Sequence, residues 1–106
     1  MSLDWEQSGG TVVVRANGEL DLTTGPELES CVNRVLEDGP PERVVLDLSE
    51  VAFLDSSGVS ALIGAWRLCR KYGSYFRVGN TSPFVARVLD VTGLADVLTL
   101  EPSPGT

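Results

Sequence analysis

The sequence predicts an α/β fold in which a mixed β-sheet has an N-terminal hairpin, central parallel strands and helices mainly on one face. Residues 3–7 and 11–16 are strand-like runs on either side of the Gly-rich segment 8–10, a pattern that predicts a β-hairpin. Beyond residue 24, segments with helical periodicity alternate with short apolar runs. This alternation favours parallel strands joined by right-handed crossovers.

The first helix is expected to begin at Thr24. Thr24 can cap free backbone amides, Glu27 can reach back to complete a capping box, and Pro26 suits a first helical turn. Apolar residues then recur at steps of three and four and mark one buried face: Leu28, Cys31, Val32, Val35 and Leu36. Residues 38–41 end this helix, and the apolar run 43–48 indicates a strand buried on both faces at the centre of the sheet.

A second helix is predicted over residues 57–71, with Gly73 after its end. Its apolar stripe, which we expect in the core, consists of Val59, Leu62, Ile63, Trp66 and Cys69. A short strand is expected over 75–78. Ser82 as a cap and Pro83 at the first helical position then predict a third helix, whose apolar residues are Phe84, Val85, Val88 and Leu89.

The C-terminal segment begins with residues 92–94, which are expected to end the third helix. Residues 97–100 are predicted to form a last strand, and residues 101–106 a loose tail rich in Pro, Ser and Gly. No internal repeat or linker interrupts the pattern. The length of 106 residues therefore suits one domain that spans residues 1–106.

Composition and charge exclude several classes of function. The 15 acidic and 8 basic residues give a net charge of −7, which disfavours direct binding to nucleic acid or to an anionic membrane. No apolar run is long enough to span a membrane, and Asp4 and Glu6 stand where a signal peptide carries cations, so a cytoplasmic protein is expected. Cys31 and Cys69 lie in apolar helical patterns, which predicts buried free thiols.

Three motifs occur in order along the chain: Gly18-Glu19-Leu20-Asp21, the run 47–58 that ends in Asp55-Ser56-Ser57-Gly58, and Thr92-Gly93-Leu94. Together they resemble the pattern of STAS domains and, more narrowly, of bacterial anti-sigma factor antagonists. The resemblance spans residues 10–100. It implies a STAS-like fold and a regulatory protein that binds other proteins.

The resemblance also implies a switch. In this family the second serine of the Asp-Ser-Ser-Gly motif, here Ser57, is phosphorylated by a partner that is both an anti-sigma factor and a serine kinase. The unphosphorylated protein binds that partner and frees a sigma factor, phosphorylation ends the binding, and a separate serine phosphatase resets the protein. Ser56 is the adjacent alternative acceptor.

The implied partner-binding surface joins two loops that precede helices. Its residues are Asp21, Thr23, Thr24, Asp55, Ser56, Ser57, Gly58 and Val59. A helix N-terminus has unsatisfied amides and a positive dipole, so a phosphate on Ser57 is tolerated there. The alternative from the residues alone is that these polar side chains only cap their helices, as such residues commonly do.

An enzyme is not expected. The chain has no His, and its one lysine, Lys71, is about 20 Å along a helix from Ser57, so neither a Ser-His nor a Ser-Lys nucleophile is available within that helix. The sequence has no phosphate-binding loop and no Cys/His cluster with metal-ligand spacing, and we predict no cofactor and no metal.

Two alternatives remain open. One is a STAS subunit of a membrane transporter or a stress-signalling complex, which shares the fold and differs in its partner. The other is a receiver-like domain phosphorylated on an aspartate such as Asp47. That chemistry requires an early acidic pair, magnesium and a suitably placed lysine, and the pair and the lysine are missing.

Overall fold

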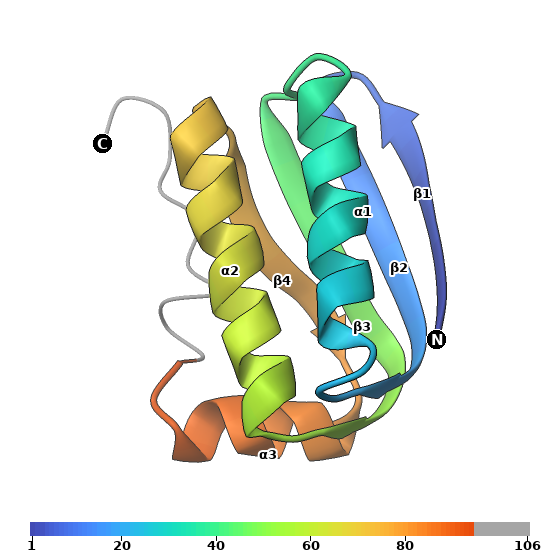
Figure 1. Ribbon diagram of the computed structural model, residues 1–106, viewed down its shortest axis with the longest axis vertical. Helices are drawn as coiled ribbons and strands as arrows, with labels where there is room; N and C mark the ends of the chain where they lie inside the picture. Colours follow the sequence, from blue (N-terminus) through green and yellow to red (C-terminus); the bar gives the residue numbers. More distant parts are fainter. Residues whose placement is uncertain (95–106) are drawn as a thin grey trace.

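The sheet and its three helices form in the part of the chain that the computed structural model describes, residues 1–94. The strand order is β1-β2-β3-β4, with β1 antiparallel to β2 and the other neighbours parallel (Figure 1). This confirms the predicted mixed sheet with an N-terminal hairpin. The elements are β1 (Ser2–Ser8), β2 (Thr11–Leu20), α1 (Gly25–Glu37), β3 (Arg43–Leu54), α2 (Ser56–Tyr72), β4 (Tyr75–Thr81) and α3 (Pro83–Val91).

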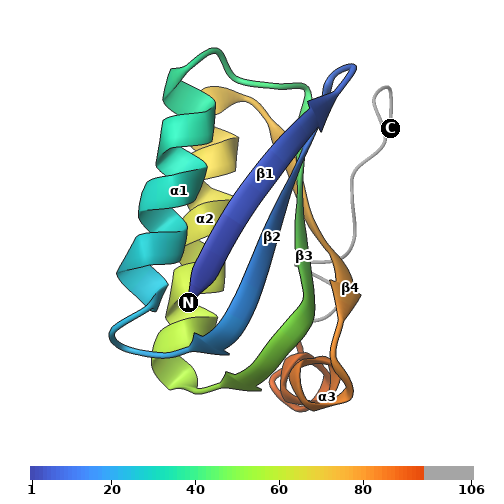
Figure 2. The same ribbon diagram turned by 90° about the vertical axis from the view of Figure 1, so that its right-hand side faces the viewer.

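The helices are arranged unevenly around the sheet. α1 and α2 lie side by side over one face, and α3 crosses the end of the sheet at which β3 and β4 finish (Figure 2). The N-termini of α1 and α2 lie at that same end (Figure 1). Loops that follow parallel strands and precede helices are therefore gathered at one end of the molecule, as is usual in α/β folds.

The core fills the space between the sheet and the two long helices. All five apolar residues predicted for the buried face of α1 are buried. The buried residues of α2, which packs against α1, are mostly small, with Leu62 as the one large side chain: Gly58, Ala61, Leu62, Ala65 and Cys69.

The prediction that Trp66 belongs to the core is wrong in part. At 100° per residue Trp66 lies to one side of the buried face of α2, and its ring is only partly buried. The guanidinium of Arg70 lies 5.0 Å from the ring centroid, in a cation–π contact. Val59 and Ile63 are likewise only partly buried.

The strands continue beyond the predicted runs. The sequence predicts this strand over residues 43–48, whereas β3 extends to Leu54. The extension forms because β2 continues beside β3 through two irregularities in register. Residues 49–54 are mostly exposed and do not alternate regularly between apolar and polar side chains. Their sequence therefore does not predict a strand. The expected turn before α2 is consequently one residue, Asp55.

The helix ends follow the predictions with one exception. Ser82 caps α3 by accepting a hydrogen bond from the amide of Val85 (3.3 Å), and Gly73 ends α2 with φ +78°. Thr24 precedes α1, but its side chain does not cap the helix and no capping box forms, because its hydroxyl lies against Glu19 and Asp21 instead. The predicted strand 97–100 and tail 101–106 fall outside the described residues.

Candidate functional site

The β3–α2 junction presents the Asp-Ser-Ser-Gly motif. Oδ1 of Asp55 accepts a hydrogen bond from the amide of Gly58 (2.9 Å), and the carbonyl of Asp55 accepts one from the amide of Val59 (2.9 Å). These bonds satisfy the first turn of α2, so Asp55 is its N-cap. Ser56 and Ser57 are the first two residues of the helix.

Gly58 allows the start of α2 to lie against the end of β2. A Cβ atom at this position would collide with the carbonyl oxygen of Leu20 and would lie 2.6 Å from Cδ1 of Leu54. The amide of Asp55 donates to the same Leu20 carbonyl (3.3 Å). The β2 and β3 ends are therefore held in fixed relation to the serines, and Gly58 itself is buried beneath them.

The β2–α1 loop is held by Asp21. Its Oδ1 accepts hydrogen bonds from the amides of Thr23 (3.0 Å) and Thr24 (3.1 Å). The Thr24 hydroxyl lies 2.6 Å from the carbonyl oxygen of Glu19 and 3.1 Å from the same Asp21 oxygen. The loop is thereby fixed by its own polar groups.

The carboxyl group of Asp21 is ionised at neutral pH. The Thr24 amide contributes most to a pKa below the ordinary value, and the Thr23 amide and the Thr24 hydroxyl add to it, while partial desolvation opposes them. A negative charge therefore stands on this loop at the same end of the molecule as the serines.

The two loops meet at a shallow hollow with a volume of about 320 Å³. We call it the Ser57 hollow, and its lining residues are Asp21, Leu22, Gly25, Pro26, Glu29, Ser57, Ser60 and Ala61. Its charged lining residues, Asp21 and Glu29, are both acidic. Of the residues predicted for the partner-binding surface, the structure thus brings Asp21 and Ser57 to one hollow.

The Ser57 side chain has an unengaged hydroxyl. Within residues 1–94 it makes no hydrogen bond, and the residue is half-buried at the rim of the Ser57 hollow. Ser56 is more exposed, and its carbonyl accepts a hydrogen bond from the Ser60 hydroxyl (3.1 Å). Both serines are accessible, and Ser57 is the one that faces the acidic hollow.

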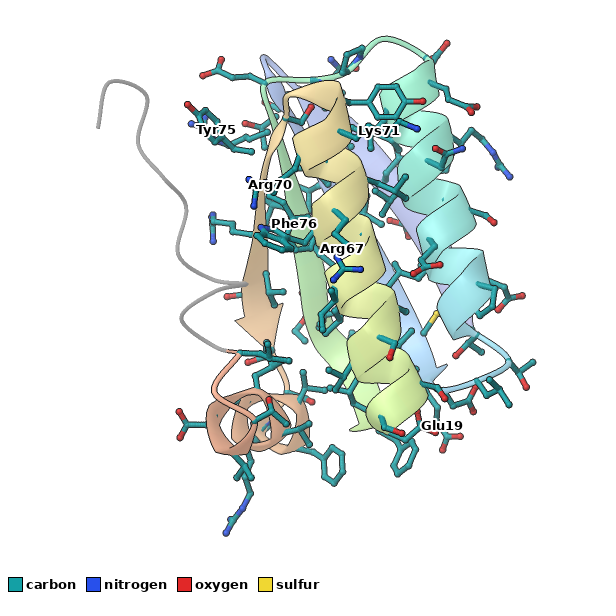
Figure 3. All side chains as sticks on the ribbon, turned by 60° about the vertical axis from the view of Figure 1, so that its left-hand side comes forward. Glu19, Arg67, Arg70, Lys71, Tyr75 and Phe76 are labelled. Atoms are coloured by element: carbon teal, nitrogen blue, oxygen red, sulfur yellow. The ribbon has the colours of Figure 1, made fainter. Side chains whose placement is uncertain are left out.

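The cations of α2 lie away from this end. Figure 3 shows Glu19 near the start of α2, whereas Arg67, Arg70 and Lys71 lie further along the helix. Arg67 is ten positions after Ser57, which is roughly 15 Å along the helix axis. A negative group on Ser57 has no cation beside it on α2.

The remaining predicted residues differ in their access to solvent. Thr23 is exposed, Thr24 and Val59 are half-buried, and Gly58 is buried. Sequence reasoning missed three exposed apolar residues at this end of the molecule: Leu22, Phe53 and Phe84. Phe53 lies inside the recognised motif, but residues 49–54 lack the regular alternation that would place its ring on one face of the strand.

The described residues contain neither a metal-binding cluster nor a membrane-spanning helix. In the described part of the chain, no three side chains of the kinds that bind metal ions come together. No helix within residues 1–94 has the length and apolar character needed to cross a membrane.

Comparison with known proteins identifies the family. A model of the STAS domain family matches residues 2–106. The anti-sigma F factor antagonist of Paenibacillus polymyxa is 30% identical over 98 residues, which cover 92% of this chain and 84% of the relative. The chain belongs to the anti-sigma factor antagonists of the STAS family. The recognised resemblance is thereby confirmed.

Solved structures of other anti-sigma factor antagonists resemble this chain over most of its length. An anti-sigma factor antagonist from Mycobacterium paratuberculosis superposes with a TM-score of 0.80 at 33% identity, covering 96% of this chain and 86% of that one. The anti-sigma factor antagonist SpoIIAA in its unphosphorylated form superposes with a TM-score of 0.73 at 25% identity, covering 96% and 89%. This chain thus has the same fold as these relatives.

Proposed function

We propose that the unphosphorylated antagonist binds an anti-sigma factor that is also a serine kinase, and so frees a sigma factor. Phosphorylation of Ser57 switches this binding off, and a serine phosphatase restores it. The observation that carries the proposal is the unengaged Ser57 hydroxyl at the rim of a hollow whose charged residues are acidic. The relatives' names supply the class of partner.

Electrostatics explains why a phosphate acts as an off-switch here. It adds about −1.5 to −2 charges at neutral pH. The hollow already carries Asp21 and Glu29, Asp55 is close by in the chain, and no lining residue is a cation. The new charge is therefore not neutralised within the hollow and repels a partner surface that suits the unphosphorylated serine.

The first turn of α2 tolerates the phosphate without unfolding. Free amides and the helix dipole stabilise negative charge at this position. Asp55 caps the turn, and Gly58 keeps the turn against β2. The switch therefore needs only a local change of charge and bulk at the surface.

The antagonist is a substrate of the kinase and performs no catalysis of its own. The partner supplies the nucleotide and the magnesium, and the antagonist presents a hydroxyl. The remaining partner-binding residues come from the β2–α1 loop and from the start of α2: Thr23, Thr24, Ser56 and Val59. Gly58 contributes by its size, from below the surface.

The receiver-like alternative is disfavoured by the position of Asp47. This residue lies in the middle of β3, where its carboxylate is 3.9 Å from the guanidinium of Arg15 and accepts a hydrogen bond from the amide of Ser49 (3.0 Å). A receiver needs its acceptor at the carboxyl end of the sheet. Serine phosphorylation is therefore the better proposal.

The direct test uses the purified anti-sigma factor kinases encoded by the same genome, titrated one at a time against the antagonist. Ser57→Asp should weaken binding at least tenfold, Ser57→Ala far less, and Ser56→Asp serves as the matched control. Incubation with the binding kinase and ATP should add one phosphate, which mass spectrometry locates on Ser57. Undiminished labelling of Ser57→Ala would contradict the assignment.

A further inference from the structure

Two phenylalanines stack on each other at the surface. The rings of Phe53, near the end of β3, and Phe84, in the first turn of α3, have centroids 5.7 Å apart and an interplanar angle of 24°. Phe53 is 39% exposed and Phe84 is 44% exposed. Aromatic side chains of this size usually lie inside a protein, and paired exposed aromatics commonly mark an interaction site.

Contacts other than the phenylalanine pair also attach α3 to the sheet. Val85 and Leu89 of α3 are buried in the core, and the Ser82 hydroxyl donates a hydrogen bond to the carbonyl of Val51 (2.6 Å). These contacts fix the helix without its exposed ring. The stack adds one more contact between β3 and α3, yet part of each phenylalanine remains open to solvent.

The pair adjoins the Ser57 turn. Phe53 is two positions before Asp55 and four positions before Ser57, so the Cα atoms of Phe53 and Ser57 lie within roughly 14 Å of each other. Leu22, which is 76% exposed, lines the Ser57 hollow. Three of the five exposed large apolar residues in the described chain thus lie at the end of the molecule that carries the proposed switch; the others are Trp5 and Val91.

The size of a protein interface makes this proximity significant. A partner that buries about 800 Å² on each side covers a patch roughly 30 Å across. A patch of that size centred on Ser57 extends as far as Phe53, whose ring stacks on Phe84. Aromatic residues are enriched in the desolvated centres of such interfaces, and a few of them supply most of the binding energy.

We propose that Phe53 and Phe84 form an apolar anchor for the anti-sigma factor, which meets the pair with apolar side chains of its own. This inference rests on the proposed function and extends it. The acidic hollow around Ser57 carries the regulated part of the interface, and the aromatic pair carries a part that phosphorylation does not alter. The anchor and the switch are separate groups, so their effects on affinity should be nearly additive.

The test compares two exposed apolar residues of the same helix. Phe84→Ser should weaken binding to the purified kinase at least tenfold in titration calorimetry, while Val91→Ser, at the 80% exposed end of α3, should leave it within twofold. In the Ser57→Asp background Phe84→Ser should reduce affinity by a similar factor. Thermal unfolding checks that each variant is folded, and Phe84→Leu, which keeps an apolar side chain without the ring, replaces Phe84→Ser if the latter unfolds.

The outcomes separate the anchor from the switch. If a folded Phe84→Ser variant binds the kinase with wild-type affinity while Ser57→Asp binds weakly, the proposal of an aromatic anchor is wrong and the proposed function stands. A wild-type chain that binds none of the kinases would overturn both. Sedimentation of the antagonist alone tests a second copy as occupant: a dimer that Phe84→Ser abolishes and Val91→Ser does not would overturn the assignment to the anti-sigma factor.

Discussion

The carbonyl oxygen of Leu20 occupies the space in which a side chain on Gly58 would begin. The same oxygen accepts a hydrogen bond from the amide of Asp55 (3.3 Å). One backbone group at the end of β2 thus fixes both the cap and the first turn of α2. The position of Ser57 relative to Asp21 depends on this contact, because the two residues follow the two elements that it joins.

Gly58→Ala should therefore destabilise the fold. A methyl group in a filled space costs about 1–3 kcal/mol, which exceeds the gain of up to about 1 kcal/mol from replacing glycine by alanine in a helix. Urea denaturation of Gly58→Ala measures the change, and Ser60→Ala, an exposed position on the same helix, is the control and should change stability by less than about 0.5 kcal/mol. An unchanged free energy of unfolding for Gly58→Ala would mean that the contact relaxes freely.

The fold could be predicted because the local signals agree with the tertiary structure. The turn at residues 8–10 and the apolar stripe of α1 are short-range features, and both lead to the observed elements. The end of β3 could not be predicted in the same way. Residues 49–54 are a strand because β2 lies beside them, and that pairing joins residues far apart in sequence.

The site was predictable only in its residue types. The motif pointed to Ser57 and Asp21, and the structure brings both to one hollow. The sequence did not indicate that the carboxylate of Asp21 accepts the amides of Thr23 and Thr24 while the Thr24 hydroxyl accepts the amide of Asp21, because either side chain suits either role. The sequence also did not predict that Phe84 is exposed. A helix of nine residues is too short for its periodicity to show which of its apolar residues lie in the core and which lie at the surface.

The stability of the antagonist should depend on the ionisation of Asp21. Hydrogen bonds from the Thr24 and Thr23 amides hold its folded-state pKa below the ordinary value of 3.8. The carboxylate therefore contributes stability above about pH 3.8, and this contribution is lost as the pH falls through the folded-state pKa. Urea midpoints of wild type and Asp21→Asn, measured from neutral to acidic pH, should converge as the pH falls.

Asp21→Asn is the informative variant because asparagine keeps an oxygen acceptor for the two threonine amides and lacks the charge. A difference in midpoint that stays constant across the pH range would show that the charge of Asp21 contributes nothing to stability.

The two thiols should be unreactive in the folded chain. Burial raises the pKa of Cys69 to about 12, and burial also raises the pKa of Cys31, which nearby Arg34 partly offsets. The thiolate is the reactive form, so iodoacetamide at about pH 8 should modify neither cysteine until the chain unfolds. Peptide mass spectrometry with and without denaturing urea measures this, and rapid labelling of Cys69 in the native chain would contradict its burial.

Asp55 should stabilise α2 chiefly as a hydrogen-bond acceptor. Asp55→Ala removes the bond to the Gly58 amide and should cost about 0.5–2 kcal/mol of unfolding free energy, as for other N-caps. Asp55→Asn keeps an acceptor in the same place and should cost clearly less than Asp55→Ala. Urea denaturation of both variants separates the cap from the charge.

Asp55→Asn also tests whether the Asp55 charge adds to the effect of the phosphate. In Asp55→Asn the phosphate at Ser57 has one fewer negative neighbour, so the repulsion that ends partner binding is weaker. The ratio of affinities between the unphosphorylated and phosphorylated forms should therefore be smaller in Asp55→Asn than in wild type, in titrations against the same kinase at low salt. Added salt should shrink this difference, because the turn is near the surface and its charges are screened. An identical ratio in the two proteins at low salt would place the repulsion on other groups, and Asp21 and Glu29 of the Ser57 hollow are then the charges to neutralise next.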